Sequence, residues 1–309
     1  PQILGTERAE NILLEPSFLS NKFGIQGRLD LLYTNEQGKN IIVELKSGKL
    51  PYPQHDNTKV DDSHAAQARL YELMLSSVMS TSRRKFESYI CYSAGVKDSL
   101  RYVSPFVTFE QRLLNNRNNI INYIETISKS TDDDLDSFFK HFDFDKTGIE
   151  LIGNMGWVRR DFDTDKNRIR GLSNLELDYF KAFYRFIYTE LILHKLGSQY
   201  SPSGSTSLWN KDDDIESSTS HLTNLSIKEN NSTDILSPSI TFQIEDFTVI
   251  ATKSIRVGDL CVLYQQKDLT SVATDNQIYK GTIESLSSKE ATISIRLRYS
   301  QSKVISERV

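Results

Sequence analysis

The chain has little cysteine, with only Cys91 and Cys261 among its 309 residues. Two cysteines cannot build a disulfide framework, so we expect a reducing compartment, either the cytoplasm with its nucleoid or the nucleus. No CxxC or histidine-rich spacing accompanies either cysteine, which argues against zinc and iron–sulfur sites. The fold is therefore expected to be stabilised by packing alone.

A long uninterrupted apolar run is also missing. The most apolar stretch, residues 179–196, is interrupted by charged side chains such as Lys181 and Glu190, so it does not match a membrane span. The first ten residues lack the basic-then-apolar layout of a secretory signal. We therefore expect no membrane partner.

An excess of positive charge is lacking too, since the net charge is −4 at pH 7. Much of the acidity lies in two runs of aspartate, residues 132–134 and 212–214, which we interpret as solvated loops. The overall charge neither favours nor excludes a nucleic-acid partner, because a basic surface can be local. Whether the chain binds nucleic acid has to be inferred from local sequence motifs.

The composition is that of an ordinary globular protein, with 38% hydrophobic and 25% charged residues. We expect an α/β domain over residues 1–197, in which a mixed sheet is flanked by helices. Residues 198–238 are rich in Ser, Asn and Asp and are predicted to be a polar linker. Short strands and turns over residues 239–309 predict a second, smaller all-β barrel domain.

The first clear local pattern is a β-hairpin. Strand-like residues 24–34 and 40–46 flank a polar turn. Apolar residues at helical spacing then predict a helix that Asp62 or Ser63 caps and that extends to about residue 80. The hairpin and this helix contain the residues on which the functional prediction depends.

Two capping boxes predict the starts of further helices. Thr108 with Gln111 would open a helix to about residue 128, and Ser173 with Glu176 a long one that stops at Gly197. The second helix is apolar on most of its circumference, so neighbours are expected to cover it. Further strands are expected over residues 86–92 and 100–103, whereas residues 130–172 show no regular pattern.

The hairpin brings two acids together. If Thr34 pairs with Asn40 around the turn, Asp30 lies directly opposite Glu44, with Cβ atoms roughly 4.5–5.5 Å apart. Two carboxylates at that range repel each other unless a cation lies between them. Oxygen ligands suit Mg²⁺ or Mn²⁺. Lys46 lies two residues after Glu44 and so shares its face.

Such a group has the parts that phosphodiester hydrolysis needs. A metal polarises the phosphoryl oxygen and lowers the pKa of a water, while a lysine stabilises the developing negative charge. The ordinary interpretation of an isolated E-x-K is a solvated surface hairpin. Here residues 41–45 are apolar on both sides of the strand, which indicates that Glu44 is buried and needs partners.

The following helix carries a polar stripe. His64, Gln67 and Tyr71 are spaced i, i+3 and i+7, so they lie on one side of the helix. This side is placed to contact a DNA phosphate or to orient Lys46. The alternative interpretation is structural: Tyr71 half-buried, Gln67 at the surface and His64 in the first turn.

Together the segments GIQGRLDLL, IIVELKSGK and HAAQARLYELML resemble the catalytic core of the RecB-type PD-(D/E)XK nucleases. The shared pattern is G-x-x-D, then E-x-K, then Q-x-x-x-Y. The resemblance implies a restriction-endonuclease-like fold in which Asp30, Glu44 and the Leu45 backbone carbonyl bind Mg²⁺ or Mn²⁺. It also implies a catalytic role for Lys46, with Gln67 and Tyr71 as the auxiliary motif.

Longer segments are similar to one group within that family, the helicase–nucleases of DNA replication and repair. AENILLEPSFLSNKFGIQGRLD resembles their nuclease domain, residues 173–197 their stalk helix, and SIRVGDLCVLY the start of their small barrel. The resemblance implies a DNA-binding hydrolase that cuts single-stranded or flap DNA. It also implies a superfamily 1 helicase motor on the same full-length polypeptide.

Two departures from that pattern matter. The family often carries a four-cysteine iron–sulfur cluster, which this chain cannot hold, so none is expected. It also has a further acidic or histidine position on an upstream helix, which the sequence here is expected to begin too late to include. Glu10 or Glu7 is the candidate replacement, although either is ordinarily a solvated carboxylate.

Other patterns in the sequence favour different interpretations. Asp161, Asp163 and Asp165 imitate the start of an EF-hand loop, but Lys166 replaces the required Gly and Leu172 the bidentate Glu. One rival function is a non-catalytic DNA-binding or scaffold module that places a partner helicase. Another is a stand-alone nuclease of the CRISPR-adaptation type, although such nucleases lack the C-terminal barrel.

Overall fold

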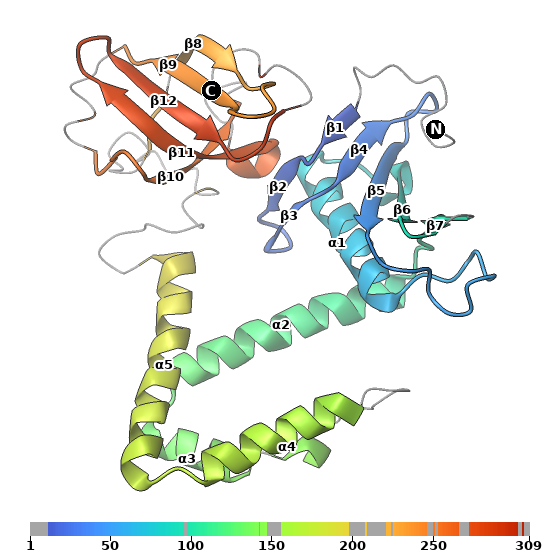
Figure 1. The fold of residues 1–309 in the computed structure, drawn as a ribbon, viewed down its shortest axis with the longest axis vertical. Coiled ribbons are helices and arrows are strands. Elements are labelled where there is room, and N and C mark those ends of the chain that lie inside the picture. The colour runs from blue at the N-terminus through green and yellow to red at the C-terminus, as the bar shows by residue number, and fades with distance from the viewer. Residues whose placement is uncertain are drawn as a thin grey trace. The chain divides into compact units, whose positions relative to one another are not determined.

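The computed structural model of the chain is mixed α/β (Figure 1). Two compact units make it up, residues 1–114 with 208–309, and residues 115–207. The sequence-based division at residues 197 and 238 stays a prediction. The structure describes residues 12–95, 98–141, 143–146, 156–197, 208, 221–223, 225–245, 250, 253–265, 272–301 and 305.

Sheet A in the first unit is mixed and has the strand order β1-β4-β5-β6-β7. Its central strands β5 and β6 run parallel, and its other neighbours are antiparallel. Helix α1 connects β5 to β6, as a parallel pair requires. The bounds are β1 (Ile12–Leu14), β4 (Leu31–Thr34), β5 (Asn40–Lys46), β6 (Phe86–Tyr92), β7 (Leu100–Tyr102) and α1 (Asp62–Val78).

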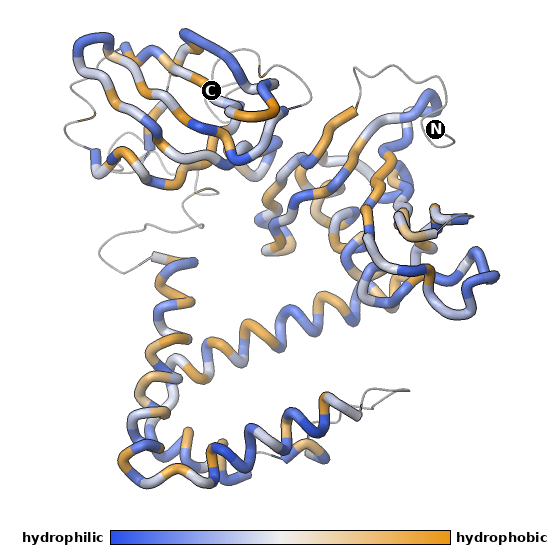
Figure 2. Tube along the Cα trace, in the orientation of Figure 1, coloured by the Kyte–Doolittle hydropathy of each residue, from blue (hydrophilic) through white to orange (hydrophobic). Residues whose placement is uncertain are grey.

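Strand β5 is buried on both sides, and its hydropathy is high along most of its length (Figure 2). Ile42 packs against α1 at Tyr71 and Leu75, whereas Ile41 and Val43 belong to a cluster on the other face. The expected alternation of faces along this strand is confirmed. Burial between two apolar layers is what holds its register, since a one-residue slip would expose both sets.

The hairpin register is confirmed, because Thr34 pairs with Asn40 and Leu31 with Val43. The expectation of one continuous strand over residues 24–34 is wrong. The chain forms β3 (Ile25–Arg28) and β4 with a break between them, and β3 belongs to a different sheet. At the break, Leu29 N–H donates to the carbonyl of Pro16 and Glu15 N–H to the carbonyl of Asp30, so pairing with the preceding segment continues although the chain changes sheet.

Helix α1 starts at Asp62, and its cap is Asp61 rather than Asp62 or Ser63 as predicted. The Asp61 carboxylate accepts a hydrogen bond from Ser63 N–H, which satisfies one of the free donors of the first turn. The predicted end near residue 80 is close, since the helix ends at Val78.

Sheet B is antiparallel and curls into a half-barrel. Its order is β3-β2-β11-β12-β9-β8, and β10 pairs with β11. Its buried core consists mainly of isoleucine, leucine and phenylalanine, among them Ile240, Phe242 and Ile295. The bounds are β2 (Ser17–Ser20), β8 (Ser226–Asn231), β9 (Ser239–Gln243), β10 (Leu260–Tyr264), β11 (Ile278–Ser287) and β12 (Thr292–Leu297).

Sheet B departs from the sequence-based expectation at both ends of its strand order, because β2 and β3 come from the segment predicted to be α/β and β8 from the predicted linker. Strand β8 lies inside the segment predicted to be a linker, and its register with β9 runs from Ser226 opposite Gln243 to Asn231 opposite Ser239. Its sequence, SIKENN, is polar and mostly exposed, so hydropathy gives no strand signal there. Pairing with β9, whose side chains Ile240 and Phe242 are buried, supplies what the local pattern lacks.

Five α-helices occur in the described residues, four of them after sheet A. In α5 the predicted capping box is confirmed, with Ser173 and Glu176 bonded reciprocally, and Gly197 ends the helix at φ +78°. No described helix combines the length and hydropathy needed to cross a bilayer. The bounds are α2 (Val107–Lys129), α3 (Asp132–Lys140), α4 (Gly156–Arg170) and α5 (Asn174–Leu196).

Three local expectations about these helices are wrong. Helix α2 already begins at Val107, so Thr108 lies inside its first turn and does not cap it. Residues 132–134 form the first turn of α3 rather than a solvated loop, since Thr131 caps them and acids are favourable at a helix start. Residues 212–214 lie outside the described residues. The described residues of the segment 130–172 are largely helical, in α3 and α4.

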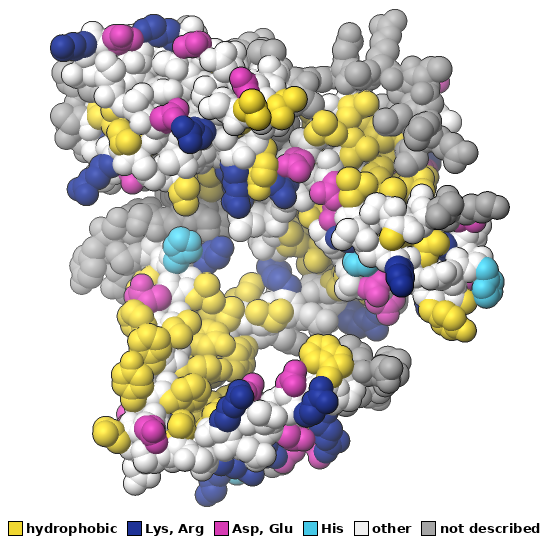
Figure 3. All heavy atoms as spheres, in the orientation of Figure 1, with side chains coloured by type: hydrophobic (Ala, Val, Ile, Leu, Met, Phe, Trp, Pro, Cys, Tyr) yellow, Lys and Arg dark blue, Asp and Glu magenta, His cyan; other side chains and the backbone are white. Residues whose placement is uncertain are grey.

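Helix α5 is only partly covered. Phe180 and Tyr184 pack on the buried residues Leu135 and Phe139 of α3. The expectation that neighbours cover most of the circumference is wrong in this structure. Hydrophobic side chains gather along the helix in Figure 3, and about half or more of the surface of several is exposed: Leu175, Tyr179, Phe183, Phe186 and Ile187.

Candidate active site

Asp30 and Glu44 lie next to each other at the end of the β4–β5 ladder. The last ladder pair is Leu31 with Val43, and Asp30 follows it outside the strand. Its Oδ2 accepts a hydrogen bond of 2.7 Å from the backbone N–H of Leu45. The side chain of Asp30 is thereby tied to the strand that carries Glu44. The structure brings the two predicted acids together.

Glu44 is a buried carboxylate with an uneven set of partners, since only 4% of its surface is exposed. Its Oε1 accepts hydrogen bonds from Lys46 Nζ at 3.0 Å and from Gln67 Nε2 at 2.7 Å. Its Oε2 is buried and accepts no hydrogen bond. An unpartnered buried carboxylate oxygen is costly, so this atom is placed to receive a cation or a donor that comes with a ligand.

The environment raises the pKa of the Glu44 carboxyl above its ordinary value. Burial is the main cause, and the nearby charge of Asp30 adds to it, whereas the hydrogen bond from Lys46 acts in the opposite direction. The effect of Lys46 on the pKa of Glu44 is smaller than the combined effect of burial and the neighbouring Asp30. A bound divalent cation would favour the ionised carboxylate and reverse the direction of the shift.

Lys46 points at the same carboxylate, as predicted from its position on β5. Its Nζ contacts Glu44 Oε1 at 3.0 Å and donates to Gln67 Oε1 at 2.7 Å. The side chain is mostly buried, with 20% of its surface exposed. The ammonium group is therefore held in one place and still reaches solvent.

Gln67 attaches the charged side chains of β5 to helix α1. Its amide oxygen accepts from Lys46, and its amide nitrogen donates to Glu44 and to Tyr71 Oη, the latter at 2.9 Å. The interpretation of Gln67 as an ordinary surface residue is wrong, because the side chain bridges the acid and the lysine. Such a bridge fixes the distance between two charged groups without adding charge of its own.

Tyr71 anchors that bridge. Its hydroxyl donates to the backbone carbonyl of Arg28 at 2.7 Å, and burial raises the pKa of the hydroxyl. The close packing extends to Gly27, where a Cβ atom would lie 2.6 Å from Tyr71 Cε1. Glycine at position 27 is thus needed because the tyrosine ring lies against its backbone. Sequence reasoning noted this glycine but missed its role.

His64 does not join Gln67 and Tyr71 in this group of contacts. Its Nδ1 lies 3.0 Å from Tyr92 Oη, and the two rings are 5.6 Å apart. Tyr92 Oη also accepts from the N–H of Asp61, so the histidine helps to join the start of α1 to β6. The predicted stripe therefore divides into two sets of contacts.

A metal ion has only part of a ligand set in the protein groups described. Among the residues that the structure describes, no cluster of three or more His, Cys, Asp and Glu side chains forms a metal site. Glu7 and Glu10 lie outside those residues. Mg²⁺ is often held by one or two carboxylates, with waters and substrate phosphates as its other ligands. Asp30 and the unpartnered oxygen of Glu44 fit that pattern.

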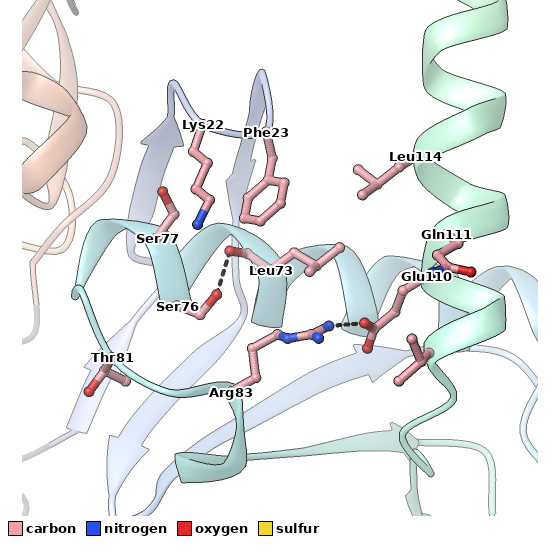
Figure 4. Close-up of a pocket in the computed structure, with 11 residues that line it drawn as sticks. Lys22, Phe23, Leu73, Ser76, Ser77, Thr81, Arg83, Glu110, Gln111 and Leu114 are labelled. Carbon is pink, nitrogen blue, oxygen red and sulfur yellow. Dashed lines mark hydrogen bonds and ion pairs between the residues drawn. The ribbon is translucent and has the colours of Figure 1, made fainter.

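A hollow of about 480 Å³ lies elsewhere in the first unit (Figure 4). Lys22 and Phe23 from the β2–β3 turn line it, together with the second half of α1 and the first turns of α2. In the close-up Lys22 points toward α1, and a dashed line joins Arg83 to Glu110. None of the acids, Lys46 or Gln67 lines this hollow, so it is separate from the candidate site.

Buried ion pairs, which sequence reasoning missed, attach α2 to α1. Arg69 of α1 pairs with Glu72 and with Glu110 of α2, and all three side chains are almost fully buried. Glu72 also accepts a 2.6 Å hydrogen bond from Ser88 of β6. Arg69 and Glu72 have the i,i+3 spacing of helix neighbours. No spacing rule predicts that Glu110 and Ser88 join them, because both are far away in the sequence.

Comparisons with known proteins add no relative: no model of a protein family matches the chain, and no curated protein matches it. The family resemblance therefore depends on the motifs quoted from the sequence. The contacts among Asp30, Glu44, Lys46 and Gln67 are an independent observation, and both serve as support for the function proposed next.

Proposed function

We propose that this chain is a Mg²⁺- or Mn²⁺-dependent deoxyribonuclease whose metal ligands are Asp30 and Glu44. The observation that carries the proposal is the state of Glu44. One of its oxygens is bound by Lys46 and Gln67, while the other is buried, accepts nothing and lies beside a second acid. A divalent cation would offset the repulsion between Asp30 and Glu44 and would also give the unpartnered Glu44 oxygen a ligand, which few other ligands do.

The protein groups have separable roles in this proposal. Asp30 and Glu44 hold the cation, with the carbonyl of Leu45 as a further ligand that the family resemblance implies. Lys46 donates to the phosphate and stabilises the negative charge that develops there. Gln67 holds the Lys46 ammonium and the Glu44 carboxylate in a fixed relation, and Tyr71 fixes Gln67. The cation supplies Lewis acidity and lowers the pKa of a water.

The substrate and setting follow from the resemblance of the longer segments. We propose single-stranded or flap DNA as the substrate, and a place as the nuclease portion of a helicase–nuclease of replication and repair. A superfamily 1 motor on the same polypeptide, a restriction-endonuclease-like fold, a separate barrel domain and a nucleoid or nuclear location belong to the same proposal. The mixed sheet A with α1 between its parallel strands supports the fold.

Cleavage of labelled flap DNA tests the proposed activity directly. The wild type should cut only when Mg²⁺ or Mn²⁺ is present, and Lys46→Ala should cut at least about 100-fold more slowly, because it lacks the charge that faces the phosphate. Lys129→Ala is the matched control, since Lys129 pairs with Glu125 at the surface. Equal cutting by Lys46→Ala and wild type would overturn the assignment.

Metal titration separates the nuclease from its main rival, a non-catalytic DNA-binding or scaffold module. A nuclease of this kind binds Mn²⁺ at a site that Asp30→Ala abolishes. A scaffold module binds DNA in the absence of metal and shows neither Mn²⁺ binding nor cleavage. Isothermal titration of both proteins with Mn²⁺, followed by the cleavage assay, distinguishes these outcomes.

A further inference from the structure

A second hollow in the first unit is lined by aromatic and basic side chains. Its volume is about 630 Å³, within the usual range of ligand sites. The start of α1, the end of β7 and the first turns of α2 contribute to it. We call it the aromatic groove and define it by Lys59, Tyr102, Phe106, Phe109 and Arg112.

One aromatic side chain of this groove is unusually open to solvent. Phe106 is 63% exposed, whereas Phe109 is partly buried. Tyr102 lines the groove at the end of β7, but its ring lies beside that of Tyr89, with centroids 5.5 Å apart, on the face of sheet A away from α1. The Arg112 guanidinium lies over the Phe109 ring, 5.3 Å from its centroid. An exposed ring in a hollow, beside a second ring and a cation, indicates a binding surface.

The polar groups of the groove favour an anionic ligand. Lys59 and Arg112 are both exposed at its lining, and Asp62 is the acid among the lining residues. The hydroxyls of Thr58, Ser104 and Thr108 add hydrogen-bonding groups. Flat rings beside cations match a nucleotide, which combines an aromatic base with a phosphate. An apolar peptide would use the rings and leave the cations unpaired.

A short path of contacts connects the groove to Lys46. Ala65 of α1 lines the groove, and the neighbouring His64 contacts Tyr92. Tyr92 stands opposite Lys46 in the parallel β5–β6 ladder. Gln67, which holds Lys46, lies on α1 two residues after Ala65. Helix α1 therefore carries both a residue that lines the groove and the glutamine that holds Lys46.

We propose that the aromatic groove binds the bases of a single-stranded nucleic acid next to the bond that is cut. Phe106 stacks on a base beside the Phe109 ring, and Lys59 and Arg112 pair with the phosphates. The inference rests on the proposed nuclease function for the identity of the ligand. It adds a subsite that the family motifs do not include, and it predicts binding without any metal.

Binding of a fluorescent oligothymidine, followed by anisotropy in EDTA, tests this subsite while cleavage is blocked. The double variant Phe106→Ala, Phe109→Ala should bind at least about tenfold more weakly, since it removes the two phenylalanine rings of the groove. Arg112→Gln should weaken binding and reduce the salt dependence, by roughly 0.7 in the slope of log affinity against log salt. Phe106→Trp keeps a stacking surface and should retain affinity.

Variants in the separate hollow of Figure 4 are the matched controls, because Lys22 and Phe23 offer the same chemistry there. Lys22→Gln and Phe23→Ala should bind the oligonucleotide as the wild type does. Thermal unfolding of every variant identifies any loss of binding that comes from misfolding. Phe106→Trp tests stacking itself. If this variant is folded but binds the oligonucleotide weakly, a stacking role for Phe106 is contradicted.

The outcomes separate this inference from the proposed function. If oligonucleotide binding depends on the groove but the protein does not cleave DNA in Mn²⁺, the proposed nuclease function is contradicted and the proposed subsite is supported. Metal-dependent cleavage, with equal oligonucleotide binding by wild type and by the double variant, would overturn the subsite alone. A wild type that does not bind the oligonucleotide in EDTA, or one that binds an apolar peptide in the groove instead, also overturns it.

Discussion

The Asp30 carboxylate accepts a hydrogen bond from the backbone N–H of Leu45 at 2.7 Å, across the end of a hairpin. Asp30 lies in the break between β3 and β4, where the chain leaves one sheet and enters another. The hydrogen bond compensates for the missing ladder contact, because it attaches the acid to β5 directly.

Asp30→Asn should separate the structural role of this residue from its role in metal binding. The amide still offers an oxygen to the N–H of Leu45 but lacks the charge that attracts a cation. We expect the stability without metal to change by less than about 1 kcal/mol. The rise in melting temperature that excess Mg²⁺ causes in the wild type should disappear. Asp145→Asn, in an exposed pair with Arg159, is the control.

Metal binding should depend on pH through Glu44. The folded-state pKa of this carboxyl is raised, so its contribution to stability is present below the unfolded pKa and is lost as pH rises through the folded value. Mg²⁺ requires the ionised form. Stabilisation by Mg²⁺ should therefore be small near about pH 5 and larger near about pH 8. Thermal unfolding at both pH values measures it.

Glu44→Gln is the matching variant for the pH experiment. It keeps the size of the side chain and removes the titration, so the metal-dependent rise and its pH dependence should both vanish. Without metal the variant should be at least as stable as the wild type at neutral pH, because a buried charge is gone. An Mg²⁺ effect in this variant equal to that of the wild type would exclude Glu44 as a ligand.

Gly27→Ala tests the contact between the first and the third motif. The new methyl group would lie 2.6 Å from the Tyr71 ring, which its hydroxyl bond to Arg28 holds in place. We expect destabilisation of about 1–3 kcal/mol, together with slower cleavage, as Tyr71 and Gln67 are displaced. Gly156→Ala meets nothing within 4 Å and should leave the stability in urea nearly unchanged.

Gln67→Met should uncouple Lys46 from Glu44. The variant has similar length but no amide, so the bridge between the ammonium and the carboxylate is lost. We expect kcat to fall about 10- to 100-fold while the affinity for DNA in EDTA stays the same, since the loss concerns positioning of the reacting groups. A change in DNA affinity with kcat intact would instead assign Gln67 to substrate binding.

Glu110→Ala should strongly destabilise the first unit. It leaves Arg69 buried without the partner that Nε now contacts at 3.0 Å. Loss of one partner of a buried pair costs about 3–5 kcal/mol. Glu125→Ala removes a mostly exposed partner of Lys129 on the same helix and should cost less than about 1 kcal/mol. Urea unfolding of the two variants gives the comparison.

Local features of the fold follow from the amino-acid pattern alone. The register that pairs Thr34 with Asn40, the buried face of Glu44 and Lys46, and the ends of α5 at Ser173 and Gly197 were all predictable. Each depends on residues within a few positions of one another. Alternation, turn length and capping chemistry act over that range, so one segment carries the whole signal.

Contacts between distant segments had to come from the tertiary structure. Arg28 and Leu31 are three residues apart yet belong to different sheets, although Leu29 and Asp30 between them still pair with the backbone of Pro16 and Glu15. Polar strand β8 forms because β9 accepts it, and Gln67 becomes a bridge because α1 crosses β5 at Glu44. Hydropathy and spacing do not specify such partners, since backbone groups and amides pair equally well with many others.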